Sequence, residues 1–143
     1  MSKIYYAGIG ARKTPPEILK QLTSYAENFS QQNYILRSGG AMGADRAFEM
    51  GCDDDKKEIF RPQDATQRAI EIASNYHPNW EACNRYVKKL HGRNAMILLG
   101  KHLNVPVEFV MCWTPEGKVT GGTGMALAIA EHYNIPVINL GAR

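Results

Sequence analysis

The sequence predicts an α/β protein with a doubly wound, Rossmann-like parallel sheet, in a single three-layer α/β/α domain that covers residues 1–143. Two observations predict this fold. Short apolar runs alternate along the chain with longer segments whose apolar residues recur at helical spacing. Glycine-rich turns follow predicted strands and open predicted helices at 8–13, 38–45 and 121–124. Because such turns meet at the carboxyl ends of the strands, we expect them to converge on one nucleotide-like ligand.

Composition favours a compact cytoplasmic protein. The chain is 44% hydrophobic, enough for a core, and no run approaches the ~18 apolar residues of a membrane helix. No signal-peptide pattern precedes the first apolar run, so we expect a cytoplasmic location and no membrane partner. A net charge of +3 is mild for a protein that grips nucleic acid through phosphates. Cys52, Cys83 and Cys112 lack metal-type spacing, so we expect free thiols, no metal site and no required cofactor.

The first glycine-rich turn follows a predicted strand over residues 4–7. Gly8 and Gly10 would let a phosphate approach the backbone, and Arg12 would neutralise its charge. The third glycine of the dinucleotide fingerprint is missing. No acidic residue stands at the end of the second strand either, so we exclude a standard NAD site.

A helix is predicted directly after this turn. Thr14 is the expected cap, Pro15 suits the first helical position, and Glu17 completes a capping box. One face of the helix is apolar and is expected to pack on the sheet; it carries Ile18, Leu19, Leu22, Tyr25, Ala26 and Phe29.

The central turn follows a predicted strand over 34–36 and leads into a short helix over 44–50. Gly39 and Gly40 would present bare N–H groups to a phosphate, with help from the hydroxyl of Ser38. Asp45 has two interpretations, which the sequence leaves open. Its carboxylate suits the first turn of a helix because of the helix dipole, and it would also suit a ribose hydroxyl.

A long helix is predicted over residues 81–99. Asn94 falls within its apolar stripe, and Arg93 lies beside that stripe. Because a buried amide must be hydrogen-bonded, Asn94 either ties down a neighbouring loop or points with Arg93 at the ligand, and we favour the second interpretation. The elements predicted before it are a strand over 58–60, a helix over 65–74 and an aromatic elbow over 76–80, which either stacks on a base or packs on the sheet edge.

The last third of the chain predicts a central strand, a loop, a helix and a final strand. The run 107–113 is nearly all apolar, as expected of a parallel strand covered on both faces. The polar loop from Thr114 to Thr120 is long enough to act as a flap. Gly121-Gly122-Thr123-Gly124 then opens a helix, and 136–140 forms the last strand.

Several stretches carry a family resemblance. Ser38 to Asp45 looks like the serine-glycine-glycine turn of DprA proteins, and Leu90 to Met96 is similar to the Met-His-x-Arg-Lys-x-x-Met helix of LOG proteins. Thr120 to Gly124 resembles the Pro-Gly-Gly-x-Gly-Thr turn of LOG proteins. Together these motifs resemble the Rossmann-like DprA/LOG (SLOG) superfamily, which groups the DNA-processing protein DprA with LOG-type phosphoribohydrolases. His77 to Trp80 and Cys112 to Pro115 look most like small, single-domain DprA-like proteins common in bacteriophages.

The resemblance also bears on catalysis. LOG enzymes place a catalytic glutamate three residues after the last glycine of their turn, and that position is Leu127 here, which cannot activate water. The matching arginine, Arg93, is present. If the protein is an enzyme, the resemblance implies a nucleotide N-glycosidase with a relocated carboxylate, and the candidates are Glu49, Glu81, Asp45 and Glu131.

Three functions follow as hypotheses. The one we favour is binding of a nucleotide or nucleotide-derived small molecule, which the protein would sense or sequester. The others are nucleoside-monophosphate hydrolysis and DprA-like binding of single-stranded DNA, and the mild charge does not favour the latter. The resemblance further implies a homodimer or higher oligomer. The expected ligand-binding residues are Gly8, Gly10, Arg12, Ser38, Gly39, Gly40, Asp45, Arg93, Asn94, Gly121, Gly122, Thr123 and Gly124.

Overall fold

The computed structural model describes residues 3–119 and 121–142, and this part of the chain forms one parallel five-stranded sheet. The strand order is β3-β2-β1-β4-β5. The predicted Rossmann-like α/β fold is therefore confirmed. The strands are β1 (Ile4–Gly10), β2 (Tyr34–Ser38), β3 (Lys57–Ile59), β4 (Phe109–Trp113) and β5 (Val137–Asn139).

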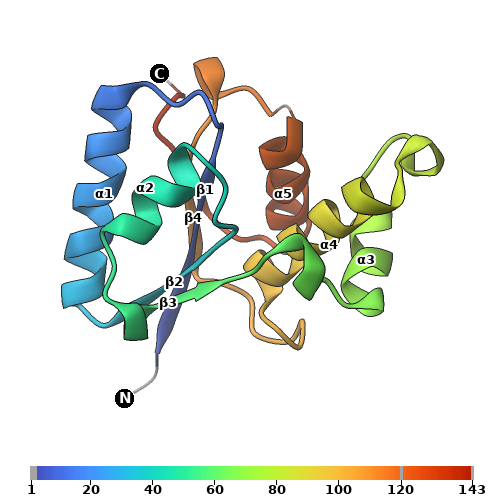
Figure 1. Ribbon diagram of the computed structural model, residues 1–143, viewed down its shortest axis with the longest axis horizontal. Helices are drawn as coiled ribbons and strands as arrows, with labels where there is room; N and C mark the ends of the chain where they lie inside the picture. The colour runs from blue at the N-terminus through green and yellow to red at the C-terminus, as the bar shows by residue number, and fades with distance from the viewer. Residues whose placement is uncertain (1–2, 120, 143) are drawn as a thin grey trace.

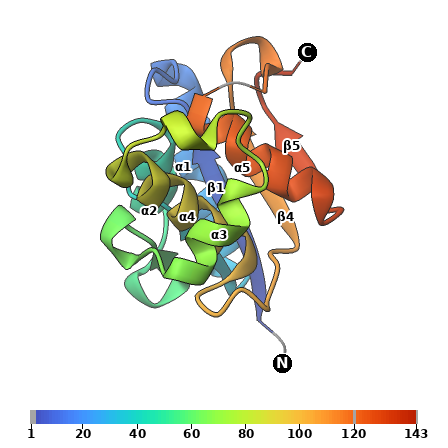
Figure 2. The ribbon, with the colours of Figure 1, turned by 90° about the vertical axis from the view of Figure 1, so that its right-hand side faces the viewer.

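Helices cover both faces of the sheet, which gives the three predicted layers (Figure 1). On one face lie α1 (Pro16–Gln31) and α2 (Ala44–Met50). On the other lie α3 (Gln67–Ser74), α4 (Arg85–Leu99) and α5 (Gly121–His132), which face the viewer in Figure 2. None of the helices in the described residues has both the length and the apolar character needed to span a membrane.

The two faces of the sheet have different cores. Under α1 and α2 the core is aromatic. The ring of Tyr6 in β1 stacks on that of Phe109 in β4 with the centroids 5.4 Å apart, and the centroid of the Phe29 ring lies 4.7 Å from that of Tyr6. Under the other helices it is aliphatic, and four consecutive residues of α4, from Met96 to Leu99, are almost fully buried. A helix that is apolar all round in its second half must be covered on every side. Helix α4 meets this condition because it packs between the sheet, α3 and α5.

Three helix starts differ from the sequence predictions. Helix α1 begins at Pro16 after Pro15 rather than after a threonine cap, because the hydroxyl of Thr14 donates to the carbonyl of Ala11 at 2.6 Å. The predicted capping box is therefore wrong. Helix α3 begins at Gln67, where Thr66 caps it by accepting from the N–H of Ala69 at 3.1 Å.

Helix α4 begins at Arg85 rather than at residue 81. Asn84 caps it by accepting a hydrogen bond from the N–H of Val87 at 2.9 Å. The preceding residues, Trp80–Ala82, form a separate 3₁₀ turn. The strong capping preference of asparagine therefore outweighed the helical pattern that extends back to residue 81.

The order of the strands determines where a ligand can reach the backbone. The chain passes from β1 to β2 and β3 on one side, and then crosses to β4 and β5 on the other side of β1. The helices that follow β1 and β4 therefore leave the sheet toward opposite faces (Figure 1). A divergence of this kind leaves a crevice at the carboxyl ends of the two strands, and residues of both strand ends line a cavity there. Ligands of open parallel sheets bind at this switch point.

Gly8 gives a test of how tightly this sheet packs. A Cβ atom at Gly8 would lie 2.6 Å from Cγ of Phe48 and 2.7 Å from Cδ1 of Leu36. Both neighbours are fully buried and have little room to move. We expect Gly8→Ala to lower the free energy of unfolding by about 1–3 kcal/mol in urea denaturation, because the core would be overpacked. Gly122→Ala is the control, since a Cβ there meets no atom within 4 Å. Equal stability of the two variants would contradict the packing described here.

Candidate functional site

A cavity of about 530 Å³ occupies the crevice at the switch point. Its walls come from the ends of β1 and β4, from the turn before α2, from the middle of α4 and from the start of α5. The predicted ligand-binding residues that line it are Gly10, Arg12, Asp45, Arg93, Asn94, Gly121, Gly122 and Thr123. The tertiary structure thus brings together residues from all three glycine-rich turns and from α4.

Asp45 is the charged group at the base of this cavity. Its side chain is buried, and Oδ2 accepts a hydrogen bond from the N–H of Ala41 at 3.4 Å. Burial raises the pKa of Asp45 to about 6, against the opposing effects of the Arg93 charge and of the N–H groups of Ala41, Gly10 and Gly39. The N–H groups of the central turn therefore face a carboxylate of the protein itself.

Arg93 holds the other side of the central turn. Its Nη1 donates to the carbonyl of Gly39 at 2.8 Å and to that of Phe60 at 3.2 Å, and its Nε donates to Oδ1 of Asn94 at 3.2 Å. A Cβ at Gly39 would lie 2.5 Å from Nη1 of Arg93 and 2.9 Å from Oδ2 of Asp45. The glycine is therefore required so that two charged side chains can approach the backbone.

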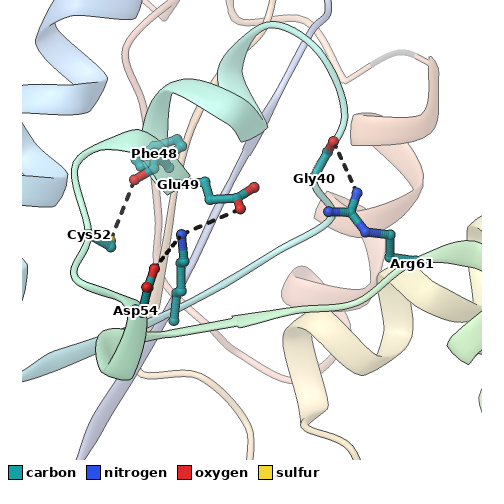
Figure 3. Close-up of polar contacts among 7 residues, drawn as sticks. Gly40, Phe48, Glu49, Cys52, Asp54 and Arg61 are labelled. Atoms are coloured by element: carbon teal, nitrogen blue, oxygen red, sulfur yellow. Dashed lines mark hydrogen bonds and ion pairs between the residues drawn. The ribbon is translucent and has the colours of Figure 1, made fainter.

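Gly40 and Ser38 are also engaged within the protein. Gly40 has a φ of +70°, and Nη1 of Arg61 donates to its carbonyl at 3.5 Å (Figure 3). The hydroxyl of Ser38 is fully buried and donates to the carbonyl of Gly8 at 2.6 Å, which ties β2 to β1. These contacts give the serine and the two glycines a structural role in the turn, without any ligand. Direct contact of Ser38, Gly39 or Gly40 with a phosphate stays a prediction.

The start of α5 is the open part of the cavity wall. Gly121 and Gly122 are exposed, and a Cβ at either position would meet no atom of residues 3–119 or 121–142 within 4 Å. The N–H groups of a first helical turn have no partner within the helix and carry partial positive charge. Gly124, one turn further, packs against the backbone of Val119, where a Cβ would lie 2.9 Å away. The glycines thus leave an accessible helix N-terminus next to the cavity.

Asn94 connects α4 to this helix start. Its Nδ2 donates to the carbonyl of Gly122 at 3.3 Å, and its Oδ1 accepts from Arg93. The two interpretations of Asn94 are therefore compatible, because it ties down the turn and also lines the cavity. The predicted flap over 114–120 includes Thr120, which lies outside the described residues. Its first residue, Thr114, is anchored to β5, since Nδ2 of Asn139 donates to the threonine hydroxyl at 2.7 Å.

The candidate catalytic glutamates do not line the cavity. Glu49 lies on α2 and forms an ion pair with Lys57 at 3.5 Å (Figure 3), while Glu81 and Glu131 are exposed. Leu127 is buried in the aliphatic core. Of the four carboxylates considered, Asp45 is the one that lines the cavity.

Sequence reasoning missed part of the lining. Val87 and Leu90 add apolar surface from α4, and His91 adds an imidazole from the same helix. Thr114 and Pro115 line the cavity directly after β4. Burial lowers the pKa of His91, and the nearby His77 and Arg93 lower it further, so its imidazole is neutral. The position of Thr114 at the carboxyl end of a central parallel strand is a signal that sequence analysis could have used, because ligands of such sheets bind at these strand ends. For Val87 and Leu90 the helical stripe indicated only core.

This fold and this crevice define a Rossmann-like α/β protein with a candidate ligand site at the switch point of its sheet. The chain is similar to the solved structure of DNA processing protein A from Helicobacter pylori, which was described for its single-stranded DNA binding mode. The TM-score is 0.63 at 16% sequence identity, over 95% of this chain and 64% of that one. The predicted DprA-like fold is confirmed by this likeness, and the chain spans 64% of its neighbour's length. No protein-family model and no curated protein sequence matches the chain.

The raised pKa of Asp45 gives a prediction for stability. A pKa raised from 3.8 to about 6 means that the folded state holds the proton more tightly than the unfolded state does. This stabilisation is complete below about pH 4 and is lost as the pH rises through 6, and it amounts to about 2–3 kcal/mol. We expect the free energy of unfolding of Asp45→Asn, measured between pH 4 and 7, to lack this decline.

The control for Asp45 is Asp54→Asn, since the side chain of Asp54 is fully exposed. It should follow the pH dependence of the unmodified protein. A decline of the same size in Asp45→Asn as in the unmodified protein would show that another group is responsible.

Proposed function

We propose that the protein binds a nucleotide in the switch-point cavity, with a phosphate on the N-terminus of α5. The observation that carries this proposal is the exposed start of α5 at Gly121 and Gly122, which borders the cavity and has open space beside its backbone. A helix N-terminus of this kind favours anions because its N–H groups and its dipole act together. Helix α5 has 12 residues, so its dipole is well developed.

The rest of the cavity lining suits the other parts of a nucleotide. A volume of about 530 Å³ is in the range of small-molecule sites. Arg12 is exposed and lines the cavity, where its guanidinium would pair with phosphate oxygens. Val87 and Leu90 offer an apolar surface for a base. Asp45 offers a carboxyl group to a ribose hydroxyl, and with a pKa of about 6 it is partly protonated near neutral pH.

A change of charge at Gly122 tests the phosphate position. We expect Gly122→Asp to weaken nucleoside-monophosphate binding at least about tenfold in calorimetric titration, because a carboxylate would compete for the same N–H groups and repel the phosphate. Fold and stability should be kept, since the position is open and an acidic residue suits a first helical turn.

The matched control for this charge is Gly122→Asn, which has the same shape without the charge and should bind within a few-fold of the unmodified protein. Native mass spectrometry of the gently purified protein would identify a bound nucleotide directly. Equal binding by the Asp and Asn variants would contradict the proposed phosphate position.

The second candidate function is binding of single-stranded DNA. The likeness to the Helicobacter pylori protein favours it, because that structure was described for its single-stranded DNA binding mode. The comparison supports this function more directly than it supports binding of a free nucleotide. In this case the cavity would accept one nucleotide of a strand, and further phosphates would lie on the surface.

The dependence of binding on salt separates the two functions. Each phosphate contact to a single strand adds about −0.7 to the slope of log K against log salt concentration. A strand bound through several phosphates therefore gives a steep slope in fluorescence anisotropy with a labelled oligothymidylate. A nucleotide held mainly by one phosphate in the cavity gives a shallow slope. Tight, salt-sensitive oligonucleotide binding together with weak mononucleotide binding would support the DNA function and contradict the nucleotide function.

A further inference from the structure

A second group of reactive side chains lies between α3 and α4. His77 follows α3, Cys83 ends the 3₁₀ turn before α4, and His91 lies in the second turn of α4. One nitrogen or sulfur atom from each of these residues lies within 4.8 Å of those from the other two. We call these three residues the His-Cys-His cluster. The segment that carries His77 and Cys83 projects from the helical layer away from the sheet (Figure 1).

His91 is the buried member of the cluster. Its side chain is only 8% exposed, and in the described part of the chain its Nδ1 is buried without a hydrogen-bond partner. A buried nitrogen of this kind costs free energy unless a donor, a water or a metal ion satisfies it. Its ring lies beside that of His77, with the two centroids 5.2 Å apart.

His77 and Cys83 already have nearly the spacing that a shared metal ion requires. The Sγ of Cys83 lies 3.5 Å from Nε2 of His77. Sulfur and nitrogen ligands on one tetrahedral zinc ion are about 3.3–3.6 Å apart, given Zn–S and Zn–N bonds of about 2.3 and 2.0–2.1 Å. Closing the whole cluster onto an ion therefore needs a contraction of at most about 1.5 Å from the present limit of 4.8 Å.

The surroundings hold the cluster in place. The backbone N–H of Cys83 donates to the carbonyl of Trp80 at 3.0 Å, which closes the 3₁₀ turn. The indole of Trp80 lies 6.1 Å from the ring of His77 and 6.0 Å from that of His91, so it shields both imidazoles. His91 is fixed by the packing of α4 on α3. A partly shielded site with one rigid ligand and two loop ligands is suited to a metal ion.

We propose that His77, Cys83 and His91 bind a zinc ion, with the fourth position left for water or an exogenous ligand. Two imidazoles and one thiolate are a ligand set that zinc prefers, and three protein ligands with an open position are typical of sites that do more than stabilise a fold. His91 also lines the switch-point cavity, so the ion would lie at its border. The zinc proposal does not rest on the proposed nucleotide function, because none of the three ligands belongs to the α5 turn.

Coordination would change one hydrogen bond. The Nδ1 of His77 accepts from the N–H of Asn79 at 2.9 Å, which leaves Nε2 to face the cysteine. When Nε2 binds a metal, the ring proton resides on Nδ1, which then no longer accepts from Asn79. The amide resonance of Asn79 should therefore shift on zinc binding, and this gives a local signal for the site.

The test uses untagged protein freed of metal by a chelator. We expect it to bind one Zn²⁺ in competition with a chromophoric chelator, and to raise its melting temperature when zinc is added. With Co²⁺ it should show the intense visible absorption of a tetrahedral site and a thiolate-to-cobalt charge-transfer band. Cys83→Ser should lose this band and bind zinc at least about tenfold more weakly.

The control is Cys52→Ser, because Cys52 contacts Tyr6 and Phe48 on the other side of the sheet. It should keep both the band and the affinity. His77→Gln gives a second test on the loop side if Cys83→Ser folds poorly. Absence of the band in the unmodified protein, or zinc binding that Cys83→Ser and His77→Gln leave unchanged, would overturn the proposal.

Discussion

The arrangement of the candidate site depends on two buried charges that meet over a single glycine. Asp45 approaches Gly39 from α2, and Arg93 approaches it from α4, so the lack of a side chain at Gly39 lets elements from opposite faces of the sheet contact one turn. Each charge would be costly if buried alone. The arginine opposes the rise in the pKa of the carboxyl, and the carboxyl opposes the fall in the pKa of the guanidinium. The turn after β2 is therefore part of the structural framework of the protein.

This framework distinguishes the central glycine-rich turn from the turn at α5. The central turn satisfies its own N–H groups with Asp45, and its carbonyls with Arg93 and Arg61. The turn at α5 has open space beside its backbone and borders the cavity. Because the central turn is closed by side chains and the α5 turn is open, we expect a bound ligand to place its anionic end at α5.

Helix α4 connects the cavity with the His-Cys-His cluster. Within one turn of this helix, His91 belongs to the cluster, Arg93 contacts the central turn and Asn94 contacts the start of α5. The second half of the same helix is buried in the aliphatic core, which fixes its position against the sheet. A helix held this firmly keeps the three polar side chains in fixed relation. A group bound at the cluster would therefore lie beside a ligand bound in the cavity.

The sequence by itself determined the fold class, the parallel sheet and the meeting of the glycine-rich turns at one edge, because these depend on periodicity and on glycine positions that are local. It also predicted that Arg93, Asn94 and Gly121 to Thr123 come together, and these residues line one cavity. Only the tertiary structure decided what each turn does. Whether the N–H group of Gly39 meets a phosphate or Asp45, and whether His77 and Cys83 meet His91, depends on how the folded chain brings its elements together. Spacing along a sequence does not predict such contacts when the residues that meet lie on an irregular loop and on a helix.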